Sequence, residues 1–327
     1  MDTLPECAVC GETAPVATAR FCEQCGAPFG AGAAPAARSG STLCKCPAPE
    51  YDEYDVCRKC GLRRPIGAKL SHIPDIETAA DDRLACASDK GRKHTVNQDA
   101  GCVARRADGA VLMVVADGVS TSSDSQSASA QAVASAREAF LAGAGAGTAQ
   151  VKDCVRAAAR AVLQLQSSET ARSDAPATTI VLAILHDSVG TFAWIGDSRG
   201  YLIEKANAIL ATADDSWASD VVAQGLASRE DALKAAQAHA ITQWLGAPLE
   251  ELKINVAETS LLAGKAVVLC SDGLWNYLDA PGQFGKTFTL AAKDCDAAAI
   301  CRNLVDVAYV AGGHDNITVA VCVLGDL

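Results

Sequence analysis

The sequence predicts a layered α+β fold for the part of the chain after residue 84, on the basis of three observations. Short apolar segments are interspersed with long alanine-rich ones, and the sequence has neither a repeated βαβ rhythm nor a Gly-rich phosphate loop. The segments 124–141 and 149–166 carry Ala, Val and Leu at helical spacing, which predicts helices that pack on a sheet. Strands are predicted at residues 111–115, 179–185, 191–195, 200–204, 266–270 and 317–323.

Chain length and net charge limit the classes of protein to which this chain can belong. A chain of 327 residues, of which 50% are apolar, has room for a core of about 240 residues plus small modules. A net charge of −11 argues against a general nucleic-acid surface and against an anionic-membrane surface. The sequence shows no signal peptide and no uncharged apolar run of about 18 residues, so we expect a cytoplasmic protein without membrane contact.

Three aspartates stand beside predicted strands. Asp117 and Asp272 follow the apolar segments 111–115 and 266–270, and Asp315 precedes the segment 317–323. A buried carboxylate is unfavourable unless its charge is compensated, and carboxylate oxygens suit Mg²⁺ and Mn²⁺. Each aspartate alone is also typical of an Asp-Gly turn. Their joint occurrence favours a metal centre.

Eight cysteines before residue 61 form two sets with metal-site spacing. Each set is predicted to hold one zinc ion through four thiolates, and the sets are Cys7, Cys10, Cys22 and Cys25, then Cys44, Cys46, Cys57 and Cys60. Unpaired reduced cysteines or two disulfides are the alternative. Modules this short cannot bury a core, so zinc binding should supply most of their folding free energy.

The expected domain order starts with these zinc modules. It is a first zinc ribbon at 1–30, a flexible linker at 31–43, a second ribbon at 44–66, a linker at 67–82 and a catalytic body at 83–327. Residues 1–66 hold seven Lys or Arg against eight Asp or Glu, so the ribbons carry no basic stripe. Protein docking or scaffolding is therefore favoured over nucleic-acid binding.

The catalytic body carries a series of short signatures. In chain order these are residues 91–99, Asp117-Gly118, Thr178-Thr179, residues 196–199, 212–216, 241–246 and 271–275, and Asp315-Asn316. Over about residues 84–325 this order resembles the type 2C metal-dependent protein phosphatases, and the amino-terminal cysteines resemble a double zinc ribbon. The resemblance implies a four-layer αββα sandwich, in which two antiparallel sheets are flanked by helices. It also implies hydrolysis of phosphoserine or phosphothreonine in proteins by a metal-activated water, in signalling with a partner serine/threonine kinase.

The resemblance also implies the metal ligands. The Asp117 carboxylate would bridge two ions, with the Gly118 carbonyl as a further ligand, and Asp272 and Asp315 would complete the first site. Asp174 resembles the acidic ligand of a third ion, and a solvated loop carboxylate is the alternative. The expected cofactors are two Mn²⁺ or Mg²⁺ ions, with a third at a weaker site.

Two positions depart from the family pattern. His94 stands where an arginine usually grips the phosphate, with Arg92 just upstream, so weaker phosphate binding is expected; a loop histidine bonded to the backbone is the alternative. Gln98 replaces a carboxylate ligand of the second metal, whereas Asp99 keeps its place and should orient metal-bound water or support Asp117. His94 and Asp99 are the predicted catalytic groups. The two departures leave a non-catalytic phosphoprotein-binding scaffold as the second hypothesis.

Two further expectations concern the catalytic body. Residues 214–246 are predicted to form a mobile flap beside the site, in which the segment 228–231 starts a helix through a capping box. The other cysteines lie in apolar surroundings and are predicted to be small core residues; they are Cys86, Cys102, Cys154, Cys270, Cys295, Cys301 and Cys322.

Overall fold

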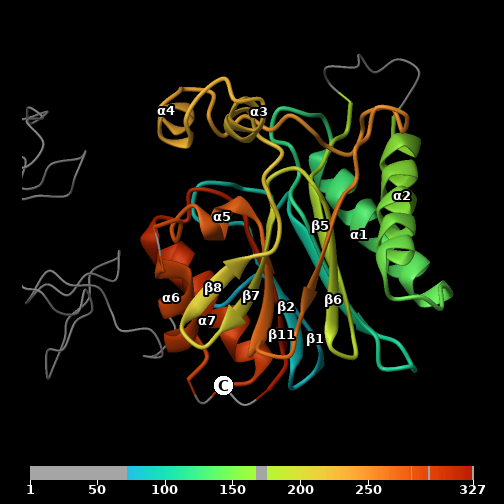
Figure 1. Ribbon diagram of the computed structural model, residues 1–327, viewed down its shortest axis with the longest axis vertical. Helices are drawn as coiled ribbons and strands as arrows, with labels where there is room; N and C mark the ends of the chain where they lie inside the picture. The colour runs from blue at the N-terminus through green and yellow to red at the C-terminus, as the bar shows by residue number, and fades with distance from the viewer. Residues whose placement is uncertain (1–71, 167–174, 281, 294, 326–327) are drawn as a thin grey trace, which may run out of the picture. The chain divides into compact units, whose positions relative to one another are not determined.

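The computed structural model describes residues 72–166, 175–280, 282–293 and 295–325. Within them, two antiparallel sheets pack face to face, and helices cover the outer face of each sheet (Figure 1). This arrangement confirms the predicted four-layer αββα sandwich. The eight predicted zinc ligands, both ribbons and Asp174 lie outside the described residues.

The first sheet has six strands in the order β1-β2-β11-β10-β7-β8, and every neighbouring pair is antiparallel. The strands are β1 (Ile76–Asp81), β2 (Leu84–Asp89), β7 (Arg199–Glu204), β8 (Asn207–Leu210), β10 (Ala266–Cys270) and β11 (Ile317–Val323). The central strands β10 and β11 have the bounds that the apolar runs predict. Both are almost entirely buried because they are covered on two faces.

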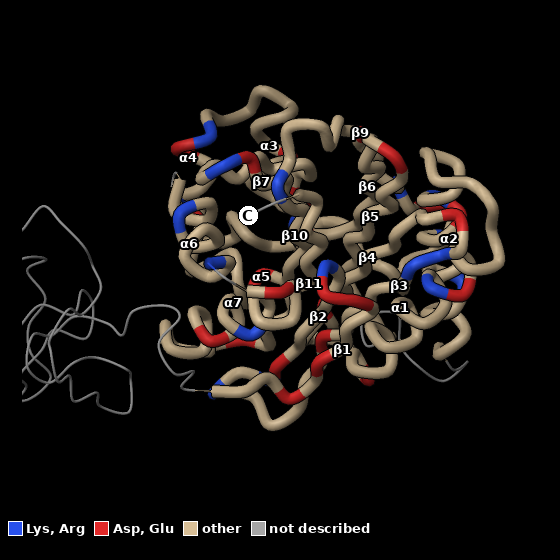
Figure 2. The backbone as a smooth tube through the Cα atoms, turned by 90° about the horizontal axis from the view of Figure 1, so that it is seen from below, with Lys and Arg blue, Asp and Glu red and all other residues tan. Residues whose placement is uncertain are grey.

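The second sheet has five antiparallel strands in the order β3-β4-β5-β6-β9. They are β3 (Ala100–Arg105), β4 (Val111–Ala116), β5 (Ile180–His186), β6 (Val189–Ile195) and β9 (Asn255–Ser260). The core between the two sheets includes Met113, Phe192 and Leu269, all fully buried. Figure 2 shows that the central strands β4, β5, β10 and β11 carry no Lys, Arg, Asp or Glu, as a two-sided apolar environment requires.

Helix pairs form the outer layers. α1 (Ser125–Ala142) and α2 (Thr148–Gln164) bury residues such as Phe140 and Val155 against the second sheet. α6 (Gln283–Ala291) and α7 (Ala297–Ala311) do the same on the first sheet with Phe288 and Leu304. The predicted helices 124–141 and 149–166 are confirmed within two residues at each end, whereas the sequence analysis did not predict α6 and α7.

Residues 76–81 differ from the expectation, because they form β1 although the sequence analysis assigned 67–82 to a linker. β1 pairs with β2 in the register Ile76↔Ser88 and Thr78↔Cys86. All six of its residues are exposed, since it is an edge strand. Backbone hydrogen bonds rather than apolar burial hold it, so the sequence carries no hydrophobic pattern there.

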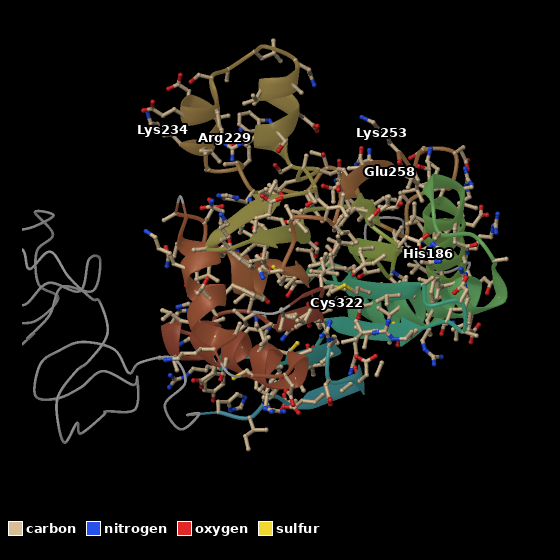
Figure 3. All side chains as sticks on the ribbon, turned by 60° about the horizontal axis from the view of Figure 1, so that its bottom comes forward. His186, Arg229, Lys234, Lys253, Glu258 and Cys322 are labelled. Carbon is tan, nitrogen blue, oxygen red and sulfur yellow. The ribbon has the colours of Figure 1, made fainter. Side chains whose placement is uncertain are left out.

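Three short helices complete the fold: α3 (Trp217–Ala223), α4 (Arg229–Leu233) and α5 (Asp272–Trp275). α3 and α4 form a small lobe that stands off the sheets and carries Arg229 and Lys234 (Figure 3). The predicted helix start is confirmed, because the Asp231 amide donates to Ser228 Oγ at 3.1 Å. The mobility expected of this segment stays a prediction.

Two other expectations concern the cysteines of the catalytic body and the absence of membrane contact. Within the described ranges all seven of these cysteines are free; five are buried, and Cys102 and Cys295 are half-buried. None of the helices described here is both long enough and apolar enough to cross a bilayer. The cytoplasmic location stays a prediction.

Candidate metal and phosphate site

Strand pairing brings the predicted aspartates to one edge of the sandwich. β3 pairs with β4 so that Ala100 lies opposite Ala116, which sets Asp99 beside Asp117. β10 pairs with β11 so that Cys270 lies opposite Val319, which brings the Asp272 end of one strand to the Asp315 end of the other. The two sheets face each other, and the four carboxylates therefore form one cluster. We call Asp99, Asp117, Asp272 and Asp315 the carboxylate cluster.

The backbone around Asp117 is held by the Thr178-Thr179 signature. The Asp117 carbonyl accepts from the Thr179 amide at 2.7 Å and from Thr178 Oγ1 at 2.8 Å. The Asp117 amide in turn donates to Thr179 Oγ1 at 3.2 Å. These bonds fix the backbone at the end of β4 from which the Asp117 carboxylate projects.

Burial and mutual repulsion raise the pKa values of the cluster. Burial, then the charges of Asp99 and Asp272, hold the pKa of Asp117 well above its usual range. Burial raises the pKa of Asp99 to about 7, against hydrogen bonds from Ser271 and Thr318 that lower it. Burial and the charge of Asp315 also raise the pKa of Asp272. Like charges gathered in one partly buried site favour a cation that would neutralise them.

Asp272 gives the clearest indication that the site suits a cation. Its Oδ1 is buried and has no hydrogen-bond partner among the described residues, whereas Oδ2 accepts from Asn276 Nδ2 at 3.2 Å. An unsatisfied buried carboxylate oxygen costs about 1–3 kcal/mol or more, and a divalent cation would satisfy it. The next residue, Gly273, has to be glycine because a Cβ at this position would collide with the Asn316 carbonyl. This close approach seats the first turn of α5 against β11.

The oxygen atoms of these carboxylates suit a divalent cation, but the side chains do not yet stand close enough together to coordinate one. Among the described residues, no three His, Cys, Asp or Glu side chains already stand in a metal-binding group. Ion binding therefore needs the carboxylates to draw together or needs other donors such as the Gly118 carbonyl. Gly118 lies deep in the site, because a Cβ there would come within 2.6 Å of the Gln98 carbonyl and 2.9 Å of Ser125 Cβ.

Asp99 is held by a buried hydrogen-bond chain that the sequence analysis missed. Ser271 Oγ donates to Asp99 Oδ2 at 2.7 Å and accepts from the Thr318 amide at 2.9 Å. Ser271 is fully buried and Asp99 is 6% exposed. The signal available in the sequence was a small polar residue between an apolar strand and Asp272. Asp99 is thus oriented by protein groups, as a supporting carboxylate would be.

The loop from Gly91 to Gln98 is fastened by the Asn316 side chain. Asn316 Oδ1 accepts from the Gln98 amide at 2.7 Å, and its Nδ2 donates to the Lys90 carbonyl at 2.9 Å and the Val96 carbonyl at 3.1 Å. On this loop, His94 Nε2 lies 3.4 Å from Asp315 Oδ1. The imidazole therefore borders the carboxylate cluster, where the sequence analysis expects phosphate.

The start of the same loop is fastened by Asp89. Asp89 Oδ1 accepts from the Gly91 amide at 2.7 Å, and Oδ2 lies 2.6 Å from His72 Nε2. Gly91 has φ +71°, and a Cβ there would collide with the Asp315 carbonyl, so only glycine fits. His72 also stacks on Tyr309 of α7, with ring centroids 3.7 Å apart.

Arg92 is engaged on the α7 side of the loop. Its amide donates to the Gly313 carbonyl at 2.8 Å, and its guanidinium carbon lies 5.4 Å from the centroid of the Tyr309 ring. A phosphate-binding role for Arg92 requires the side chain to leave that ring. Among the two predicted phosphate-binding residues, His94 is the one that the structure sets beside Asp315.

Asp197 is a further buried carboxylate to which the sequence analysis gave no role. It follows β6 just as Asp117 follows β4, so the same strand-end signal was present. Burial, then the charges of Asp272 and Asp214, raise the pKa of Asp197 to about 8. Its carbonyl accepts from Trp275 Nε1 at 3.0 Å, which ties it to α5.

Arg199 links the site to the α3–α4 lobe. Its guanidinium binds both oxygens of Asp214, at 2.9 and 2.7 Å, and Asp279 Oδ1 at 2.7 Å. It also lies 3.5 Å from the centroid of the Trp275 ring. Because the planar guanidinium is paired with two carboxylates and stacked on an indole ring, it fixes the position of Asp214, which lies at the start of the lobe.

Comparison with known proteins identifies the family of this chain. The family model described as Protein phosphatase 2C matches residues 88–307, and the chain belongs to that family. The serine/threonine phosphatase Stp of Listeria monocytogenes is 26% identical over 238 residues, which cover 71% of this chain and 92% of the relative. The protein phosphatase PhpP of Streptococcus pneumoniae is 31% identical over 144 residues, which cover 44% of this chain and 56% of the relative.

Solved structures match over the same region. The PPM Ser-Thr phosphatase MsPP of Mycobacterium smegmatis, in complex with cacodylate, has a TM-score of 0.59 and 29% identity, covering 74% of this chain and 98% of that one. The catalytic domain of the serine threonine protein phosphatase PstP, in complex with two manganese ions, has a TM-score of 0.59 and 26% identity, covering 75% and 98%.

Proposed function

We propose that this protein is a metal-dependent phosphatase that removes phosphate from phosphoserine and phosphothreonine residues of proteins. The observation that carries the proposal is the buried, unpartnered Asp272 Oδ1 within a cluster of mutually repelling carboxylates. His94 borders this cluster at Asp315. The relatives named serine/threonine phosphatases support the same reaction and substrate class.

The chain would hold the metal through the groups that the sequence analysis assigned. These are Asp117, the Gly118 carbonyl, Asp272 and Asp315, with Asp174 and Gln98 at the further sites. Mn²⁺ or Mg²⁺ bound there would activate a water molecule and offset the charge of the phosphoryl group. A related structure contains two manganese ions.

The other side chains bind and orient. Asp99, held by Ser271, supplies a fixed acceptor for a proton of the attacking water. His94 donates a hydrogen bond to a phosphate oxygen beside Asp315. This bond offsets part of the repulsion between the phosphate and the Asp315 carboxylate. Because imidazole offers a single donor on that side where guanidinium offers a fork, the phosphate is held less firmly than by an arginine.

The test is phosphate release from a phosphothreonine peptide. We expect activity that requires added Mn²⁺ or Mg²⁺ and that is lost in Asp117→Asn and in Asp272→Asn. Asp279→Asn, which changes an exposed partner of Arg199, is the matched control and should keep most activity. Full activity in excess chelator would refute the proposal.

A non-catalytic phosphoprotein-binding scaffold is the second candidate, and Gln98 and His94 are the observations that favour it. A neutral amide at residue 98 removes a carboxylate that the family uses to hold the second ion, and His94 removes a permanent cation. This candidate predicts phosphopeptide binding without turnover. Metal-dependent turnover that single substitutions at Asp117 and Asp272 abolish would exclude it.

The amino-terminal modules complete the proposal. We assign residues 1–30 and 44–66 to two zinc ribbons that dock a protein partner, and we expect a cytoplasmic serine/threonine kinase to act on the same substrates. The proposed boundaries keep 31–43 as a linker and place the catalytic body after residue 66, with β1 included. Two equivalents of zinc per purified chain, lost on replacing Cys7 and Cys44 by serine, would support the ribbons; no bound zinc would refute them.

A further inference from the structure

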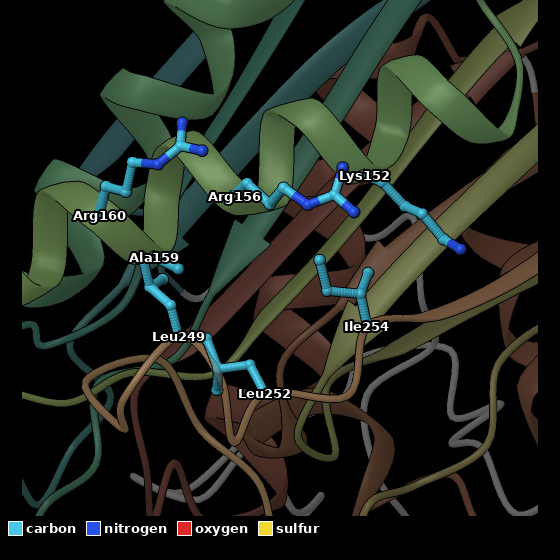
Figure 4. Close-up of a pocket in the computed structure, with 7 residues that line it drawn as sticks. All are labelled: Lys152, Arg156, Ala159, Arg160, Leu249, Leu252 and Ile254. Carbon is cyan, nitrogen blue, oxygen red and sulfur yellow. The ribbon is translucent and has the colours of Figure 1, made fainter.

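A groove of about 350 Å³ lies between α2 and the segment that leads into β9 (Figure 4). It is separate from the residues of the carboxylate cluster. One wall is basic and the other apolar: the lining residues are Lys152, Arg156 and Arg160 on α2, with Ala159, and Leu249, Leu252 and Ile254 across from them. The groove therefore offers two chemically different walls to one occupant.

The positive charges of the basic wall are not neutralised by strong ion pairs. Arg156 pairs with Asp153 at 3.2 Å, but these side chains are 50% and 66% exposed, so the pair contributes little. In the described part of the chain, neither Lys152 nor Arg160 has an acidic partner. This excess of positive charge belongs to the α2 wall, since the exposed Glu250 and Glu251 lie between Leu249 and Leu252 on the facing segment, and it stands in a protein whose net charge is −11. It would attract an anionic partner that the rest of the surface repels.

The spacing of the cations matches an extended chain. Lys152, Arg156 and Arg160 are four residues apart on α2, so successive cations are separated by about 6 Å along the helix axis. In an extended peptide, alternate side chains lie on one face about 6.6 Å apart. Acidic residues at alternate positions could thus meet α2. The residues between them would face Leu249, Leu252 and Ile254.

Hydrogen bonds connect the carboxyl-terminal end of α2, beyond the groove, with the carboxylate cluster. Gln166, just beyond α2, donates from Nε2 to the Gly246 carbonyl at 2.7 Å. The neighbouring Leu245 exchanges backbone hydrogen bonds of 3.1 and 2.8 Å with Thr178, whose Oγ1 donates to the Asp117 carbonyl. The Arg160 end of α2 is therefore the end nearer to the cluster.

We propose that this groove is a second docking site, which binds an extended segment of the phosphoprotein substrate with alternating acidic and apolar residues. The identity of the partner rests on the proposed phosphatase function. The segment would lie apart from the phosphorylated residue, so the groove selects the substrate protein and takes no part in the chemistry.

Direct binding tests the groove independently of turnover. The probe is a fluorescein-labelled, unphosphorylated peptide Glu-Leu-Glu-Val-Glu-Leu, and fluorescence anisotropy is measured with the full chain at low salt, without added Mn²⁺ or Mg²⁺. We expect binding that falls at least tenfold in the double variant Arg156→Glu/Arg160→Glu. The control variant Lys286→Glu/Lys293→Glu makes the same charge change at exposed positions on or next to α6 and should bind as the native protein does.

Each outcome of the binding test decides the proposal. An equal loss in both double variants would show a general charge effect and overturn the proposal, as would no binding by the native protein. Equally tight binding of a Gln-Leu-Gln-Val-Gln-Leu peptide would overturn the role of the cations. Because neither Mn²⁺, Mg²⁺ nor phosphate is added, these results stand whether or not the protein hydrolyses phosphopeptides.

Kinetics then connect the groove to the substrate. A phosphothreonine peptide with the acidic segment attached through a flexible linker should show a KM at least fivefold lower than the same peptide without it, at equal kcat. In Arg156→Glu/Arg160→Glu that advantage should disappear, while turnover of the short peptide stays unchanged. Binding of the segment without any KM advantage would overturn its role in substrate docking.

Discussion

Replacing Asn316 by alanine tests whether one buried side chain holds the loop beside the carboxylate cluster. Asn316 is 3% exposed and makes three hydrogen bonds, to the Gln98 amide and to the Lys90 and Val96 carbonyls. Each such bond contributes about 1 kcal/mol, and a buried group left without a partner costs about 1–3 kcal/mol. Asn316→Ala should therefore lower the free energy of unfolding by roughly 2–4 kcal/mol. In a domain of this size that corresponds to a fall in Tm of roughly 5–15 °C.

The loop carries His94, so Asn316→Ala should also raise KM for a phosphothreonine peptide more than it lowers kcat. Urea unfolding without added Mn²⁺ or Mg²⁺ and steady-state kinetics in saturating Mn²⁺ measure the two effects. Asn303→Ala is the matched control, since Asn303 is also buried and donates to the Ala291 carbonyl at 2.7 Å, away from the loop. The control should lose stability without a change in KM. Equal KM changes in both variants, or none in Asn316→Ala, would refute the proposed link between loop anchoring and phosphate binding.

Three further predictions follow from the electrostatics of the site. Asp272→Asn should weaken Mn²⁺ binding about 100-fold, which calorimetry would record as about 2.7 kcal/mol. The same variant should raise the Tm of the protein without Mn²⁺, because it removes a repelling charge from beside Asp315. A lower Tm would contradict this explanation. His94→Arg should lower KM for phosphopeptide about three- to tenfold, because a planar fork replaces a single donor, and an unchanged KM would place the phosphate elsewhere. Asp197 has a pKa raised from 3.8 to about 8, so the folded state binds its proton more tightly and loses stability as pH rises from about 4 to 8. Asp197→Asn should therefore raise Tm in chelator more at pH 9 than at pH 5, and an equal gain at both pH values would show that this titration has no effect.

Much of the interior of the fold could be predicted because apolar runs mark it, whereas the fully buried strand β2 was missed because its sequence LACASD forms no apolar run. The bounds of β10 and β11 follow directly from uninterrupted apolar segments, and those of α1 and α2 from helical spacing. β1 was missed because an exposed edge strand is held by backbone hydrogen bonds and needs no hydrophobic pattern. The same reason applies in part to β8 and β9, whose residues are all half-buried or exposed.

The candidate site divides in a similar way. Asp117, Asp272 and Asp315 could be identified as a group because each is a carboxylate next to a buried strand. Asp197 satisfies the same rule after β6, but its importance depends on burial near Asp272, which only the fold reveals. Ser271 could not be recognised, because its role depends on an oxygen of Asp99, 172 residues away in the chain.

The sequence by itself determined which residues can carry the chemistry: acids at strand ends, and a histidine in place of the arginine that is usual in the family. Tertiary structure decided how these residues act. Strand register set Asp99 beside Asp117, the Asn316 side chain fastened the His94 loop, and the Tyr309 ring engaged Arg92. The division has a physical reason. Residue type and local hydrophobic period are properties of short segments, whereas repulsion, burial and hydrogen-bond partners arise only between segments that folding brings together.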